Sequence, residues 1–164
     1  MIFGMTPFTF VHVVLSLVGI GSGFVVVYGL FAAKRLDVWT TVFLASTVAT
    51  SMTGFLLPFE RFLPSHAVGA LSLAVLAVAI LARYARHLAG AGRWMYVLGG
   101  VTALYLNVFV LVAQLFQKVP GLNALAPTQS EPPFLLTQLA LLALFVVFAI
   151  AATIKFGAAP VRAT

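Results

Sequence analysis

Long blocks of hydrophobic residues alternate with short polar segments along the chain. Five apolar runs, each of about twenty residues or more, are separated by short segments that carry most of the prolines and most of the charges. The runs cover residues 7–33, 38–57, 65–84, 94–117 and 133–156. Apolar runs of this length can cross a bilayer as helices. The pattern therefore predicts a single domain, residues 1–164, that folds as an all-α integral membrane bundle of five transmembrane helices.

The composition agrees with this pattern. Hydrophobic residues make up 63% of the chain and charged residues only 7%, whereas soluble domains contain about 25% charged residues. A soluble fold is therefore excluded. The chain contains no cysteine, which also excludes disulfide scaffolds, thiolate metal sites and iron–sulfur clusters.

The distribution of basic residues predicts an orientation. With the N-terminus outside and the C-terminus inside, seven of the nine Lys and Arg residues fall on the inner side, namely Lys34, Arg35, Arg83, Arg86, Arg93, Lys155 and Arg162. Cytoplasmic segments are enriched in such residues. We interpret Arg83, Arg86 and Arg93 as contacts for anionic lipid headgroups. The cations are too dispersed for a nucleic-acid partner.

Small and polar residues within the runs predict how the helices pack. Gly19 and Gly23 form a GxxxG pair, which permits close approach of helices, and we favour packing within one bundle over a homodimer seam. Asn107 lies near the middle of the fourth run, so its amide should face the bundle interior. Gln114 and Gln138 lie toward the outer ends of their runs and are positioned to form an interhelical hydrogen bond.

Two histidines are candidates for binding chemistry. His12 and His66 lie in the outer part of two runs that enter from the same side. Such a pair can ligate a b-type haem or a metal, or bond a quinone oxygen, although structural roles in helix packing and at the membrane interface are favoured. With Asn107, Gln114 and Gln138 they form the candidate ligand-binding group. Glu60, Arg61 and the proline-rich loop 118–133, which includes a Thr128–Glu131 capping pattern, are expected to cover the outer mouth.

Four stretches resemble a known group of proteins. These are TVATSMTGFLLPF (47–59), ARYARHLAGAGRW (82–94), ALYLNVFVLVAQ (103–114) and LAPTQSEPPF (125–134). They resemble small multi-pass inner-membrane proteins of Gram-negative bacteria to which no activity is assigned. The resemblance implies a location in the bacterial inner membrane and a similar number of spans.

Three functions remain open from the sequence. The favoured one is a non-catalytic accessory or scaffold protein, acting in a larger membrane complex or a homo-oligomer. The second is a redox or ligand-binding bundle that holds haem b, a quinone or another lipophilic molecule in the outer half of the membrane. The third, a channel or transporter, is disfavoured because no ionisable residue lies in the middle of a span. No nucleophile–base arrangement or carboxylate pair indicates catalysis.

Overall fold

The computed structural model describes residues 6–57, 64–158 and 162–163. Five long helices coincide with the five apolar runs, which confirms the predicted all-α bundle. They are α1 (Pro7–Phe31), α2 (Asp37–Leu56), α3 (Pro64–Ile80), α4 (Gly92–Lys118) and α6 (Pro132–Ala158). A π-helical turn, η1 (Leu81–Ala85), continues α3, and α5 (Pro120–Leu125) is short. Strands β1 (Lys34–Arg35) and β2 (Arg162–Ala163) pair in parallel.

The number of membrane-spanning helices differs from the prediction. Within the described residues, four helices are long and apolar enough to cross a membrane: α1, α3 with η1, α4 and α6. This indicates a multi-pass membrane protein with four candidate spans rather than five. Helix α2 is long enough but insufficiently apolar, because seven of its 20 residues are Ser or Thr: Thr40, Thr41, Ser46, Thr47, Thr50, Ser51 and Thr53.

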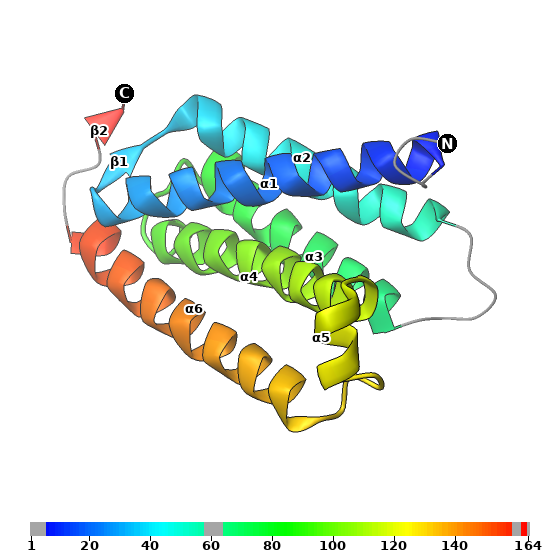
Figure 1. Cartoon of the computed structure of the whole chain (residues 1–164). Helices are drawn as coiled ribbons and strands as arrows, with labels where there is room; N and C mark the ends of the chain where they lie inside the picture. The colour runs from blue at the N-terminus through cyan, green and yellow to red at the C-terminus, as the bar shows by residue number, and fades with distance from the viewer. Residues whose placement is uncertain (1–5, 58–63, 159–161, 164) are drawn as a thin grey trace.

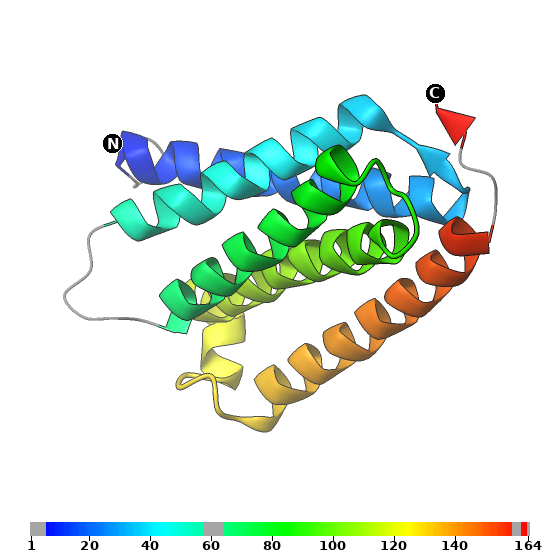
Figure 2. The same ribbon diagram turned by 180° about the vertical axis from the view of Figure 1, so that it is seen from behind.

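The first four long helices form a ring. Helix α1 packs on α2, α2 on α3, α3 on α4, and α4 on α1, so α1 and α3 are diagonally opposite. Helix α6 packs outside this ring against α4 and α1. Figure 1 shows α6 close to the others near β1 and splayed away near α5, and Figure 2 shows the same arrangement from behind. Less-apolar α2 is thus in contact with both α1 and α3.

Local sequence explains where several helices begin. Thr6 caps α1 by accepting a hydrogen bond from the amide of Thr9, and Pro7 occupies the first turn, where its missing N–H costs nothing. The Thr128–Glu131 pair forms as expected, since Glu131 Oε1 accepts hydrogen bonds from the amide and the hydroxyl of Thr128. This turn precedes α6 instead of lying in its first turn, because the helix begins only at Pro132.

The segment between α4 and α6 is more structured than the expected loop. It contains α5, whose Asn123 side chain donates a hydrogen bond to the Phe116 carbonyl at 3.3 Å. Phe116 and Phe134 pack edge to face beside Ala126 and form a small second core. Glu60 and Arg61, the other residues expected at the outer mouth, lie outside the described residues.

Glycines bring the helices into close contact. A Cβ atom on Gly23 would lie 2.7 Å from Leu104 Cδ1 of α4 and 2.9 Å from Phe43 Cε2 of α2. A Cβ on Gly19 would lie 3.1 Å from Thr47 Oγ1 of α2. The GxxxG pair therefore packs within the bundle, which confirms the favoured interpretation.

Candidate functional site

A cavity of about 130 Å³ lies inside the ring of α1–α4. It occupies the end of the bundle formed by the N-terminal parts of α1 and α3 and the C-terminal parts of α2 and α4. Its volume is several times the ~10–15 Å³ that one water needs. The cavity is therefore large enough for a group larger than a single water.

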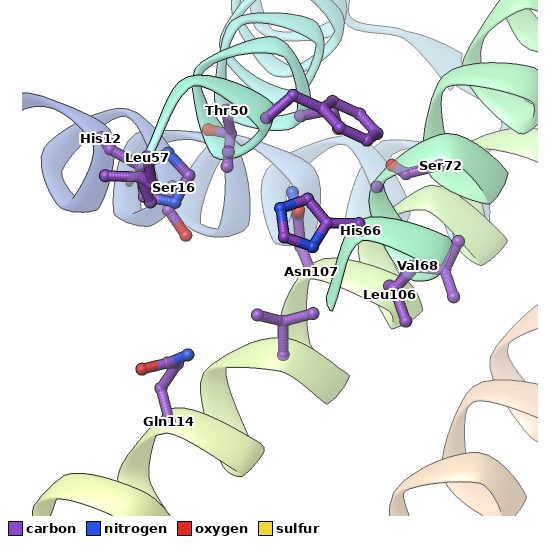
Figure 3. Close-up of a pocket in the computed structure, with 15 residues that line it drawn as sticks. His12, Ser16, Thr50, Leu57, His66, Val68, Ser72, Leu106, Asn107 and Gln114 are labelled. Atoms are coloured by element: carbon purple, nitrogen blue, oxygen red, sulfur yellow. The ribbon is translucent and has the colours of Figure 1, made fainter. Parts of the chain in front are cut away.

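Side chains from all four helices of the ring line this cavity (Figure 3). The lining residues are His12 and Ser16 of α1; Thr50, Ser51, Gly54, Phe55 and Leu57 of α2 and its end; His66, Val68, Gly69 and Ser72 of α3; and Leu106, Asn107, Val110 and Gln114 of α4. Among the described lining residues, the polar members are hydroxyls, amides and imidazoles, and none is Asp, Glu, Lys or Arg. The described lining is therefore polar but without fixed charge.

Four of the five candidate binding residues meet at this cavity, namely His12, His66, Asn107 and Gln114. Gln138 does not line it. It is buried against α4, where its Nε2 donates a hydrogen bond to the Phe109 carbonyl at 3.2 Å. The expected Gln114–Gln138 hydrogen bond is absent, because Gln138 bonds the backbone of α4 instead. Gln114 contributes to the cavity lining.

The two histidines reach the cavity from opposite helices of the ring. His12 Nδ1 lies 2.8 Å from Thr53 Oγ1 of α2. The Thr53 hydroxyl also lies 2.7 Å from the Ala49 carbonyl of its own helix, so it links the imidazole to the backbone of α2. His66 is 5% exposed and packs against the ring of Phe55, with 5.7 Å between ring centroids. Both imidazoles are thus held in place by α2.

Asn107 faces the bundle interior, as its position in α4 predicts. It is 8% exposed, and its Nδ2 donates a hydrogen bond to Thr47 Oγ1 of α2 at 3.2 Å. Hydrogen bonds of this kind between membrane helices contribute about 0.5–2 kcal/mol. The bond holds α4 against α2 at the inner side of the cavity.

Two hydroxyls in the cavity wall have no hydrogen-bond partner. Thr50 of α2 is 8% exposed and Ser72 of α3 is 3% exposed, and neither Thr50 Oγ1 nor Ser72 Oγ is bonded within the described structure. Other helical hydroxyls donate to a backbone carbonyl one turn earlier, as Ser46 does to Val42 at 2.6 Å. Sequence alone did not single out Thr50 and Ser72 as site residues, because hydroxyls in apolar helices ordinarily bond their own backbone.

A second polar cluster lies at the opposite end of the bundle. Arg83 of η1 is 3% exposed, and its Nη2 forms an ion pair with Asp37 Oδ1 at the start of α2. The guanidinium also lies over the rings of Tyr84 and Tyr96, at 5.5 and 5.2 Å from their centroids. Tyr96 in turn shares a 3.1 Å hydrogen bond with Thr40.

This cluster corrects the expected lipid-binding group. Arg83 is inside the protein, because the π-helical turn buries it against α2 and α4, whereas Arg86 is exposed and Arg93 partly exposed. Arg83 is therefore not a surface residue, and Arg86 is the exposed member of the expected group. The sequence analysis did not identify Asp37 as the partner of Arg83. The one signal for such a role was its position at the start of a helix, next to Lys34 and Arg35.

The cavity can hold a neutral molecule and form hydrogen bonds with it. Its chemistry does not extend to a multidentate metal site, since no three His, Asp or Glu side chains converge anywhere in the part of the chain that is described. No family model, curated protein or solved structure matches this chain, so the cavity itself is the basis for a functional proposal.

Proposed function

We propose that this chain is a membrane protein that binds a neutral, lipophilic small molecule in the cavity between α1, α2, α3 and α4. The observation that carries the proposal is the cavity itself, of about 130 Å³, with its polar but uncharged lining. Pockets that combine an apolar wall with a few convergent polar groups are the usual form of small-molecule sites.

The uncharged side chains of the described lining favour a neutral ligand. A carboxylate or ammonium group placed among these residues would lose its hydration without gaining an opposite charge, which is costly in a low-dielectric interior. A neutral head loses less and can still bond the imidazoles, amides and hydroxyls. Leu57, Val68, Leu106 and Val110 supply the apolar contacts for the rest of the molecule.

Of the cofactors considered from the sequence, a quinone fits this lining and haem b fits it less well. A quinone is neutral and lipophilic. Haem carries two propionates, and no Lys or Arg is present among the lining residues that the structure describes to pair with them. The histidines are therefore assigned to hydrogen bonding rather than to axial ligation.

Ligand binding is compatible with the accessory role that the sequence favoured, because binding requires no catalytic group. We place the protein in the bacterial inner membrane with its N-terminus outside. In this orientation the less apolar α2 also crosses the membrane, in contact with the candidate spans α1 and α3. The distribution of the basic residues supports this orientation: Lys34, Arg35, Arg86, Arg93 and Lys155 all lie at the end of the bundle opposite the cavity. The cavity would then open toward the outer half of the membrane, and the exposed Arg86 would contact anionic headgroups.

A cavity-filling variant tests the proposal. A Cβ on Gly54 would meet only His12 Cε1, at 3.5 Å, so the larger side chain of Gly54→Leu would extend into the cavity. Gly21→Leu is the matched control, since Gly21 is exposed on α1 and has no atom within 4 Å of its Cβ position.

The proteins are purified from membranes in dodecyl maltoside, and bound small molecules are extracted and identified by mass spectrometry. We expect a neutral lipophilic compound that copurifies stoichiometrically with the unsubstituted protein and with Gly21→Leu, and that is lost from Gly54→Leu. Identical extracts from all three proteins would refute binding in this cavity.

A further inference from the structure

Thr50 and Ser72 differ from the other polar residues of the cavity wall in their hydrogen bonding. They lie on α2 and α3, respectively, and their hydroxyl oxygens are the two buried oxygens of the described cavity lining that lack a hydrogen-bond partner. Leaving a buried hydroxyl without a partner is unfavourable. Such a pair in a cavity wall therefore indicates a group that completes it.

The missing partner is a hydrogen-bond acceptor. A hydroxyl has one donor and two acceptor lone pairs, and in helices the donor is normally satisfied by the carbonyl one turn earlier. Ser46, Thr53 and Ser22 each form that bond, whereas Thr50 and Ser72 do not. Because serine and threonine occupy more than one χ1 rotamer in helices, either hydroxyl can turn toward an oxygen atom in the cavity.

We infer that the ligand carries a carbonyl oxygen that accepts hydrogen bonds from Thr50 and Ser72. This inference rests on the proposed function and specifies its ligand: a neutral lipophilic molecule with a ketone or ester carbonyl. Two sources share this chemistry, namely a quinone ring and the ester of an acyl lipid. His66, 5% exposed, lines the same cavity.

Isosteric variants separate the hydroxyls from the shape of the cavity. Thr50→Val and Ser72→Ala remove one donor each. Their controls are Thr153→Val and Ser22→Ala, whose hydroxyls donate to the carbonyls of Ala149 and Val18 and do not line the cavity. Since the hydroxyls of Thr50 and Ser72 are unpartnered, their removal should leave the melting temperature of the ligand-free protein unchanged or higher.

Binding is measured with three probes in dodecyl maltoside, which contains no carbonyl: decylubiquinone, methyl oleate and octadecene. The readouts are the shift in melting temperature and the Kd from calorimetry. We expect at least one carbonyl probe to bind, and each of Thr50→Val and Ser72→Ala to weaken it about three- to tenfold. Octadecene should bind the unsubstituted protein, Thr50→Val and Ser72→Ala with equal, weaker affinity, and the control variants should bind each probe as the unsubstituted protein does.

The outcomes separate this inference from the proposed function. If Gly54→Leu abolishes binding but Thr50→Val and Ser72→Ala do not change it, the carbonyl assignment is overturned and the binding site stands. The same holds if octadecene binds at least as tightly as both carbonyl probes. If no probe binds, or if Gly54→Leu binds every probe normally, the proposed function itself fails. A response to decylubiquinone alone identifies a quinone-type ligand, and one to methyl oleate alone identifies an acyl ester.

Discussion

The ion pair between Asp37 and Arg83 is asymmetric in burial. The Asp37 side chain is 47% exposed, whereas that of Arg83 is 2% exposed. Removing the carboxylate leaves a guanidinium in the protein interior without its counter-charge, while removing the guanidinium leaves a carboxylate that water can solvate. The two substitutions should therefore differ in their effect on stability.

We predict that Asp37→Asn lowers the free energy of unfolding by about 2–3 kcal/mol, less than loss of a partner from a fully buried pair because Asp37 is half exposed. Arg83→Met should cost only about 1 kcal/mol, mainly through the lost cation–π contacts with Tyr84 and Tyr96. Both values are measured by denaturant unfolding in detergent micelles. A larger loss for Arg83→Met than for Asp37→Asn would contradict this explanation.

The type of each polar residue and its position within an apolar run predicted only part of the candidate site. His12, His66, Asn107 and Gln114 were found because polar side chains in apolar runs are expensive and face the interior. Thr50 and Ser72 were not found, because they stand out only by lacking the usual hydrogen bond to a backbone carbonyl, which the sequence does not reveal. Arg83 was assigned to the surface because its rotation toward Asp37 depends on a π-helical turn, which no local sequence signal indicates.

The contact between α3 and α4 depends on Gly99. A Cβ on Gly99 would lie 2.9 Å from Ala79 Cβ and 3.4 Å from the Val75 carbonyl oxygen. These neighbours belong to the backbone or are attached directly to it, so they cannot move aside as a flexible side chain would. The next residue, Gly100, has no atom within 4 Å of its Cβ position.

We predict opposite effects for two adjacent alanine substitutions. Gly99→Ala should destabilise the protein by about 1–3 kcal/mol, because the added methyl overpacks the α3–α4 contact. Gly100→Ala should stabilise it by about 0.5–1 kcal/mol, since it lowers the conformational entropy of the unfolded chain. Thermal unfolding of the two variants in parallel measures the difference. Equal stabilities would indicate that α3 and α4 are not in close contact here.

The long helices were predictable from the sequence, whereas the short helix α5 and the low hydropathy of α2 were not predicted. Apolar runs with a proline near one end locate α1, α2, α3, α4 and α6 to within a few residues, because length and hydropathy dominate in lipid. The short helix α5 forms where a proline-rich loop was expected, and the small core around Phe116 and Phe134 stabilises it. Helix α2 was predicted to span the membrane because its apolar run is long enough. Its Ser and Thr residues lower its hydropathy, and it is the one long helix of the described residues that is not a candidate span.

The proposed orientation of the whole molecule can be tested with single cysteines, since the natural chain contains none. Ala89, between η1 and α4, lies at the basic end, and Ser130, before α6, lies at the other end; both are exposed. In intact bacterial cells, a membrane-impermeant maleimide should label Ser130→Cys and should label Ala89→Cys only after the cells are lysed. The reverse pattern would place the N-terminus inside.

The central claim concerns the occupant of the cavity, and the most direct measurement is a crystal structure of the protein purified without delipidation. We predict continuous density in the cavity, with one atom within hydrogen-bond distance of Thr50 Oγ1 or Ser72 Oγ, and loss of that density in Gly54→Leu. A cavity that contains only ordered water in the unsubstituted protein would contradict the account.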